Sequence, residues 1–347
     1  MKRVAVLGCG AWGTAVARVI AENAASSNEF CSEVVLFARN EIHEGRSLAD
    51  WINKDHINPV YLPFLNIPDN VVAKDDVVEV VKDADIIAVA YPCPYFISFC
   101  KGLILYPEEN RVKLVSDLIR EQTGKRCVVV SGATTALEVA QQQFTEATIG
   151  TKSFDRGNEV KRLLQTEYFK FVVTQDDVGV ELCGGIKHVV AIAAGICDGL
   201  KLGDNTKAAV LRIGFWEMSE LMKELFPDRG TDWFTIEQSS GMAELFMCMA
   251  HQTDKIPEVG SDLDLMNINV GHRLSLVDGS PLLPEFSKKT HRTFTDGVEY
   301  AAQIYNILAA RHRTAHFPLF VAVHRICRNE LKPEDFLHCL ESHPIHL

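Results

Sequence analysis

The hydrophobic pattern of the chain changes character near its middle. In the first half, short apolar runs rich in β-branched residues alternate with amphipathic segments, and such runs are typical of strands buried on both faces of a parallel sheet. The runs lie at residues 3–7, 34–38, 84–90 and 127–130. A short acidic segment at residues 75–83 has helical spacing. This alternation predicts a doubly wound, Rossmann-like α/β sheet.

Beyond about residue 178 the strand-like runs nearly disappear and helical spacing takes over. Candidate helices cover residues 178–200, 205–226, 235–250, 296–312 and 319–329. The polar, irregular segment 250–294 is rich in proline and glycine, and a stretch of this length is typical of a functional lid or of a partly disordered segment. We therefore predict a dinucleotide-binding domain over 1–177, an all-α substrate and dimerisation domain over 178–347, and a ligand cleft between them.

Length and composition narrow the class of protein. The 347 residues fit two domains of about 150 residues each. Acidic residues outnumber basic ones 46 to 35, which argues against nucleic acid or an anionic membrane as the main partner. No apolar run approaches the roughly 20 residues that span a bilayer, and the N-terminus lacks a secretory signal. The ten cysteines contain no C-x-x-C pair. These features predict a soluble, cytoplasmic protein.

A glycine-rich turn follows the first predicted strand directly. Residues 8–13 read Gly-Cys-Gly-Ala-Trp-Gly, and a helical pattern continues from there. A G-x-G-x-x-G sequence between a strand and a helix is typical of dinucleotide binding, because it brings the helix N-terminus and its N–H groups to the pyrophosphate. The residues expected to bind the cofactor are Gly8, Gly10, Ala11, Trp12 and Gly13.

The end of the second predicted strand bears on the identity of the cofactor. An acidic residue that contacts the ribose of NAD usually stands there, but this chain has Arg39. An arginine at this place can meet the 2′-phosphate of NADP, or it can stack on the adenine or face solvent. The pattern thus leaves NAD and NADP both open.

Lys187 is the most unusual residue of the second half, because it interrupts a helix that is otherwise apolar for several turns. A buried lysine is stable only if it is paired or faces an aqueous cleft, unless its amine reaches the surface. Buried lysines lower their pKa readily, which suits proton transfer at a carbonyl. Lys187 is therefore a candidate catalytic residue.

His312 and His316 have the i, i+4 spacing of a zinc site on a helix. No carboxylate or cysteine stands close in sequence, and Arg311 and Arg313 would repel a cation. We therefore predict no metal.

The chain resembles, nearly end to end, the eukaryotic type of NAD-dependent glycerol-3-phosphate dehydrogenase. The resemblance is carried by the motifs at residues 8–15 (GCGAWGTA), 61–63 (YLP), 182–187 (LCGGIK), 197–200 (CDGL), 203–210 (GDNTKAAV), 317–320 (FPLF) and 338–340 (HCL). It implies a Rossmann-like domain followed by a helical domain, NAD as cofactor, and a homodimer. It also implies interconversion of sn-glycerol 3-phosphate and dihydroxyacetone phosphate, a small phosphorylated substrate.

The resemblance also assigns roles to residues. The family's general acid/base lysine falls at Lys187, its catalytic aspartate at Glu244 and its second lysine at Lys101. The family's Arg-Asn pair, which grips the substrate phosphate, is absent from residues 251–254, and Arg273 is the candidate to take over that contact. Four other polar positions of the family carry different residues here, namely His188, Cys248, Phe294 and Asp296.

Three functions are consistent with this sequence. The leading hypothesis is an active dehydrogenase in which Lys187, supported by Glu244, protonates the alkoxide that forms at C2. The altered polar positions motivate the alternative of a catalytically impaired member that acts as a cofactor-binding or regulatory protein. A dehydrogenase for another small hydroxy compound, one without a phosphate, is the third.

Overall fold

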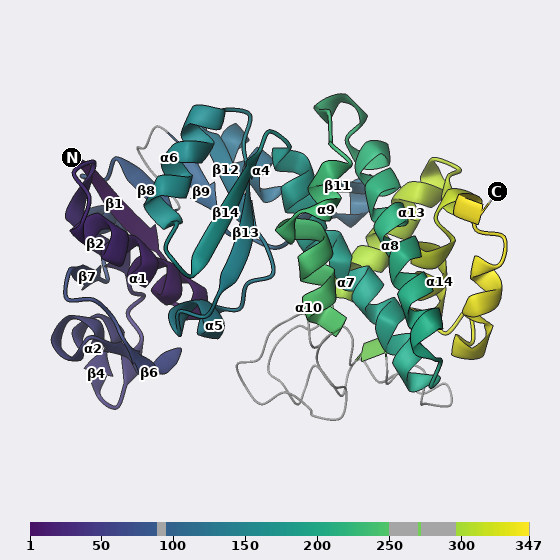
Figure 1. Cartoon of the computed structure of the whole chain (residues 1–347), viewed down its shortest axis with the longest axis horizontal. Helices are drawn as coiled ribbons and strands as arrows, with labels where there is room; N and C mark the ends of the chain where they lie inside the picture. The colour runs from purple at the N-terminus through teal and green to yellow at the C-terminus, as the bar shows by residue number, and fades with distance from the viewer. Residues whose placement is uncertain (89–94, 250–269, 272–295, 347) are drawn as a thin grey trace. The chain divides into compact units, whose positions relative to one another are not determined.

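The computed structural model describes residues 1–88, 95–249, 270–271 and 296–346 (Figure 1). Contacts between residues divide the chain into two units, each with its own core. Unit 1 comprises Met1–Cys100 and Val115–Asp177, and unit 2 comprises Lys101–Leu114 and Val178–Leu347. The sequence-based division at residue 177 assigns Lys101–Leu114 to the first domain, whereas in the structure this segment packs with unit 2.

Unit 1 is built on an eight-stranded sheet with the order β14-β13-β12-β9-β8-β1-β2-β7. The strands are β1 (Lys2–Leu7), β2 (Phe30–Phe37), β7 (Val71–Lys74), β8 (Ile86–Ala88), β9 (Tyr95–Ser98), β12 (Arg126–Ser131), β13 (Thr145–Gly150) and β14 (Phe169–Thr174). Among these described strands, neighbours pair in parallel except β12 with β13. From β1 the chain builds outward to β2 and β7, then returns to β8 on the other side of β1. This reversal is the topological switch point at which doubly wound sheets bind ligands, and it confirms the predicted Rossmann-like fold.

Helices and small ribbons complete unit 1 (Figure 1). The helices are α1 (Ala11–Ala25), α2 (Leu48–Asp55), α3 (Val77–Val81), α4 (Val115–Thr123), α5 (Ala136–Ala140) and α6 (Phe154–Leu164). The ribbons pair β3 (Ile42–His43) with β4 (Arg46–Ser47) and β5 (Ile57–Asn58) with β6 (Leu62–Asn66). Ser or Asp side chains accept backbone N–H groups at the starts of α2, α3 and α6, and Thr135 does so at α5, so these short helices begin at defined residues.

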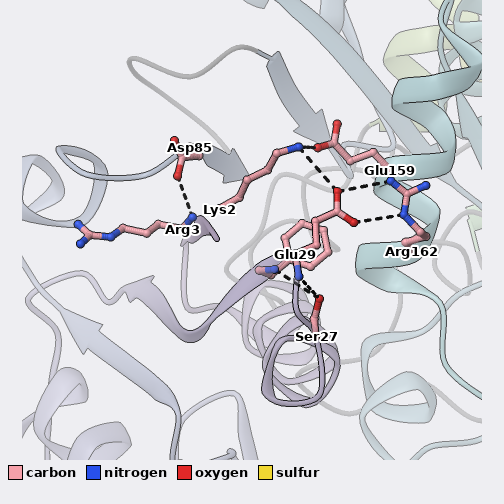
Figure 2. A network of polar contacts seen from close by, with 8 residues as sticks. Lys2, Arg3, Ser27, Glu29, Asp85, Glu159 and Arg162 are labelled. Carbon is pink, nitrogen blue, oxygen red and sulfur yellow. Dashed lines mark hydrogen bonds and ion pairs between the residues drawn. The ribbon is translucent and has the colours of Figure 1, made fainter.

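A charged network ties the start of β1 to α6 (Figure 2). The Lys2 ammonium pairs with Glu159 on α6 and lies 3.8 Å from Glu29 Oε1. Glu29 in turn accepts hydrogen bonds from the Arg162 guanidinium at 3.3 and 3.4 Å. Several of these side chains are partly exposed, and an exposed pair contributes only about 0–1 kcal/mol. The network therefore orients α6 on the strand more than it stabilises the unit.

In its described residues, unit 2 is helical apart from one hairpin. Its helices are α7 (Asp177–Gly199), α8 (Asp204–Leu225), α9 (Phe234–Glu237), α10 (Glu244–Met249), α13 (Asp296–Ala310) and α14 (Pro318–Cys327). The antiparallel hairpin of β10 (Leu103–Tyr106) and β11 (Arg111–Leu114) adds a feature that the prediction of an all-α domain did not include.

Helix α7 lies in the core of unit 2. By length and composition alone it could cross a membrane, but its most apolar 18-residue window is 100% buried within the structure. Residues of α7, α8, α13 and α14 belong to one apolar cluster. The length and hydrophobicity of α7 are therefore those of a core helix.

The helix predicted over residues 235–250 is interrupted. Between α9 and α10 the chain forms a π-helical turn over Ser239–Ala243. A Cβ at Gly241 would lie 2.2 Å from the carbonyl oxygen of Ile236, so this close approach of the backbone requires glycine. Glu244 follows the turn directly as the first residue of α10.

Candidate active site

In unit 1 the glycine turn joins β1 to α1 within three residues. Gly8 has a φ of +113°, a conformation that favours glycine. A Cβ at Gly13 would lie 1.7 Å from the carbonyl oxygen of Gly8, so only glycine lets α1 pack this closely on the end of β1. A Cβ at Gly10 would meet nothing within 4 Å. The space beside the first turn of α1 is therefore open.

This geometry fits a dinucleotide. The N–H groups at the start of α1 have no side-chain cap, since Gly10 stands at the N-cap. Ala11 and Trp12 form the first turn, and the Trp12 ring packs against Phe99 with the ring centroids 6.4 Å apart. An uncapped helix N-terminus with open space before it suits a pyrophosphate. The residues that the sequence predicts to bind the cofactor all lie in this turn or in the first turn of α1.

Asn58 supports this turn and was not identified from the sequence. Its buried amide donates hydrogen bonds to the Cys9 carbonyl oxygen at 2.7 Å and to Thr14 Oγ1 at 2.8 Å. Its carbonyl oxygen accepts the backbone N–H of Tyr61 at 3.1 Å. Asn58 thereby fastens the glycine turn from both ends. The only sequence signal is its place three residues before the Tyr61-Leu62-Pro63 motif.

Arg39 follows β2 and is exposed beside the glycine turn. Burial raises the pKa of the Cys9 thiol, and a hydrogen bond from the Arg39 backbone opposes part of that rise. Glu41, two residues later, accepts a hydrogen bond from the Tyr61 hydroxyl at 3.1 Å. An acidic side chain is therefore present near the strand end after all, although two residues beyond the position at which the sequence pattern places it.

In unit 2 a buried cluster brings Lys101, Lys187 and Glu244 together. The Lys187 ammonium pairs with Glu244 Oε2, and the Lys101 ammonium lies 2.7 Å from Glu244 Oε1. The side chains of Lys187 and Glu244 are 0% exposed, and that of Lys101 is 20% exposed. One carboxylate thus bridges two ammonium groups. The Lys187 amine is paired inside unit 2 and does not extend to the surface.

The three residues come from separate segments that the fold holds close. Lys187 lies in the middle of α7, Glu244 begins α10 after the π-helical turn, and Lys101 precedes β10. A Cβ at Gly185 would lie 2.7 Å from Leu103 Cγ, so a glycine on α7 lets the hairpin approach. The hairpin segment therefore delivers Lys101 to the neighbourhood of Lys187.

The cluster is held together by charge. Glu244 contacts two lysine side chains at once, and desolvated cations are stable only when paired. A lysine held as ammonium by a carboxylate can also donate a proton to a developing alkoxide.

Several predicted positions cannot be compared with the structure. Arg273 and Phe294 lie outside the described residues, and so do the side chains of Cys248 and Asp296. His188 is described: it is buried beside Lys187 and stacks on Tyr300.

The two histidines with zinc-like spacing are not on one helix. His312 follows the end of α13 with a φ of 55°, and His316 lies in a separate short turn, Thr314–His316. Within the described part of the chain, no group of three or more His, Cys, Asp and Glu side chains could hold a metal ion.

Comparison with protein families gives two matches. The family model for the NAD-dependent glycerol-3-phosphate dehydrogenase N-terminus matches residues 3–96 and 91–156. The model for the C-terminus of the same family matches residues 176–338.

Individual relatives match over nearly the whole chain. Human glycerol-3-phosphate dehydrogenase 1-like protein is 35% identical, with 99% of this chain and 98% of the relative covered. Human cytoplasmic NAD(+) glycerol-3-phosphate dehydrogenase is 35% identical, with 100% and 99% covered. The solved glycerol-3-phosphate dehydrogenase of Saccharomyces cerevisiae superposes with a TM-score of 0.85 at 29% identity, covering 98% of this chain and 99% of that one. The structure from Plasmodium falciparum gives 0.85 at 26% identity, with 98% and 95% covered.

Proposed function

Because the chain belongs to the NAD-dependent glycerol-3-phosphate dehydrogenase family, we propose that it is an active enzyme that interconverts sn-glycerol 3-phosphate and dihydroxyacetone phosphate. Family membership makes the chain an NAD-dependent oxidoreductase, as the family resemblance of the sequence implies. The observation that supports catalytic competence is the buried cluster of Lys101, Glu244 and Lys187.

Unit 1 is proposed to hold the cofactor. The turn of Gly8, Gly10 and Gly13 would bind the pyrophosphate with the N–H groups at the start of α1, and Asn58 keeps that turn in place. Bound NADH supplies the hydride. Arg39 and Glu41 would lie toward the adenosine end of the cofactor, by their position after β2.

Side chains of unit 2 are proposed to supply the proton for the reduction and to stabilise the charge that develops on the substrate oxygen. Reduction of the ketone moves the carbonyl electron pair to oxygen, and the resulting alkoxide takes a proton from Lys187 Nζ. Glu244 keeps Lys187 protonated until that moment, and water restores the proton afterwards. General acid catalysis of this kind contributes about 10²–10⁴-fold to a rate. In the oxidative direction the neutral amine would accept the proton of the C2 hydroxyl.

The substrate phosphate needs cationic contacts. Lys101, the partly exposed member of the cluster, is proposed to provide one of them. Arg273, outside the described residues, remains the proposed bidentate contact, because a guanidinium matches a phosphate with two parallel hydrogen bonds.

Reduction of dihydroxyacetone phosphate by the purified protein, followed as loss of NADH absorbance, tests this function. We expect turnover in the wild type and a decrease of about 10²–10⁴-fold in kcat for Lys187→Ala, with NADH binding retained. The matched control is Lys223→Ala, which removes an exposed lysine paired with Glu220. A wild type that binds NADH without turnover would instead support the alternative of a cofactor-binding or regulatory protein. Turnover only with a neutral hydroxy ketone would support the third function.

We further propose a cytoplasmic homodimer. The names of relatives that match nearly the whole chain include cytoplasmic enzymes, which supports the location. The resemblance on which the dimer rests is to a dimeric family. Light scattering after gel filtration tests the dimer, since a monomer mass at micromolar concentration would contradict it, and cell fractionation tests the location.

A further inference from the structure

Tyr300 contacts both lysine-bearing segments of unit 2. It lies on α13 with 6% of its surface exposed. Its hydroxyl accepts a hydrogen bond from the backbone N–H of Leu103 at 2.9 Å, two residues after Lys101. Its ring stacks on His188, the neighbour of Lys187, with centroids 6.1 Å apart and an interplanar angle of 22°. One buried side chain therefore joins the two segments.

Gly102 makes the approach of the tyrosine possible. A Cβ at this position would lie 3.0 Å from the Tyr300 hydroxyl oxygen, which is tighter than most contacts of a real Cβ. The hydroxyl therefore rests directly against the backbone between Lys101 and Leu103. The hydrogen bond and this close contact together fix the path of the chain where Lys101 leaves it.

The fixed backbone matters because a lysine side chain is long and has many rotamers. The Lys101 ammonium contacts Glu244 Oε1 at 2.7 Å, although its side chain remains 20% exposed. A shift of the backbone would let the ammonium exchange Glu244 for water. The ion pair thus depends on where residues 101–103 are held.

We propose that Tyr300 is a positioning residue that holds Lys101 on Glu244 and so keeps the cluster of two lysines and one carboxylate assembled. Its effect on catalysis rests on the proposed function, whereas its effect on Lys101 does not.

Gln303 provides a matched control on the same helix. Its amide donates weaker hydrogen bonds to the carbonyl oxygens of Tyr106 and Arg111, at 3.3 and 3.4 Å, at the far end of the same hairpin. Gln303→Ala therefore weakens the contact between α13 and the hairpin, but it leaves the contacts of the segment that carries Lys101 unchanged. Tyr300→Phe removes one hydroxyl and keeps the ring that stacks on His188.

The first experiment measures the accessibility of Lys101 without any activity assay. The full-length protein is treated briefly with a limiting amine-acylating reagent, and mass spectrometry compares modification of Lys101 with that of Lys223, an exposed lysine on α8, as internal reference. We expect Tyr300→Phe to raise the relative modification of Lys101 about threefold or more. In this variant the buried N–H of Leu103 has lost its acceptor, which costs free energy unless the segment that carries Leu103 and Lys101 shifts. Gln303→Ala should leave the ratio at the wild-type value. An unchanged ratio in Tyr300→Phe would overturn the proposal.

The second experiment is kinetic. We expect Tyr300→Phe to lower kcat/KM about tenfold in the wild-type background and to have almost no further effect in Lys101→Ala, because residues that act as one unit are not additive. A purely structural role of Tyr300 would lower kcat/KM equally in both backgrounds, and that result would overturn the proposal. Gly102→Ala places a Cβ against the Tyr300 hydroxyl and should lower kcat/KM in the same way. This variant replaces Tyr300→Phe in the experiment if Tyr300→Phe does not fold.

The two experiments separate the two proposals. If the wild type lacks turnover but Tyr300→Phe exposes Lys101, the positioning role stands and the proposed function fails. If the wild type turns over and Tyr300→Phe changes neither Lys101 modification nor kcat/KM, the function stands and the positioning role fails.

Discussion

Glu244 is the residue on which the buried cluster depends. Each of its carboxylate oxygens faces a different lysine, and its side chain is fully buried. Removing one partner of a buried ion pair is far more damaging than removing both, because an uncompensated charge stays in a poorly solvated place. Here the removal of one carboxylate would take from both Lys101 and Lys187 the anion that they share.

Glu244→Gln should therefore destabilise the protein strongly. The amide keeps the volume of the side chain but cannot balance either lysine, so the free energy of unfolding should fall by about 3–5 kcal/mol. Urea denaturation measures it. The control is Glu220→Gln, whose contact to Lys223 is partly exposed and should change stability by less than about 1 kcal/mol. Equal losses in the two variants would show that the cluster is solvated.

The sequence identifies the members of this cluster unequally. Lys187 is visible from the pattern alone, because a charged residue within a long apolar helix needs a partner. No local pattern distinguishes Glu244 or Lys101, because Glu244 reaches Lys187 only after the π-helical turn and Lys101 reaches Glu244 from the segment before the hairpin. The family resemblance pointed to both residues. Asn58 was missed for the same reason, because its partners Cys9 and Thr14 lie 49 and 44 residues away in sequence.

At the scale of elements, the features that depend on neighbouring residues in sequence were predictable. The first strand, the glycine turn and α1 follow from one continuous segment, and α7, α8 and α14 lie close to their predicted bounds. Strands β13 and β14 were missed because their sequences mix polar and apolar residues and their burial is set by the sheet around them. The hairpin of β10 and β11 was missed because it packs with unit 2, although the chain around it belongs to unit 1.

The glycine turn gives a prediction at this scale. Gly13→Ala places a Cβ 1.7 Å from the Gly8 carbonyl oxygen, so α1 must move away from β1 and its N–H groups must leave the place proposed for the pyrophosphate. We expect the Kd for NADH, measured by calorimetric titration, to rise about tenfold or more, since several charge-assisted hydrogen bonds are displaced.

Gly203→Ala is the matched control for this change. Gly203 also precedes a helix, α8, but a Cβ there meets nothing within 4 Å. The Kd of this variant should stay within about twofold of the wild type, since no backbone group has to move. A Gly13→Ala protein with wild-type affinity would show that the cofactor does not rely on this turn.

At the scale of the whole molecule, contacts between distant parts of the chain decide how unit 2 holds its C-terminal segment. Glu217 on α8 accepts the backbone N–H groups of Leu319 and Phe320 at 2.7 and 2.9 Å, and so caps the N-terminus of α14. His343 Nε2 lies 2.9 Å from the same carboxylate. The Nδ1 atom of that ring accepts the N–H of Ile345, so Nε2 carries the proton and donates it to Glu217. Glu217, His343, Leu319 and Phe320 are all buried, and no local pattern in the sequence predicts this arrangement.

Glu217 makes the stability of the chain depend on pH in a definite direction. Burial raises the pKa of Glu217, and the hydrogen bonds from His343, Phe320 and Leu319 only partly oppose it. The folded protein therefore keeps a proton that the unfolded chain, with an ordinary glutamate pKa of about 4.3, has already released. As pH rises from that value through the raised pKa, the contribution of Glu217 to the free energy of unfolding decreases.

Glu217→Gln should remove this decrease, because an amide does not titrate. Urea denaturation at a series of pH values from about 4 to 7 should give a wild-type curve that falls relative to the variant as pH rises. The control is Glu334→Gln, which changes an exposed glutamate of the same unit. Its free energy of unfolding should change with pH as that of the wild type does, which excludes the loss of one charge as the cause of the difference. If the free energy of unfolding of Glu217→Gln also changes with pH as that of the wild type does, the pKa of Glu217 is not raised by folding. In that case α14 is capped by an ionised glutamate, and the burial of Glu217 has no influence on the pH dependence of folding.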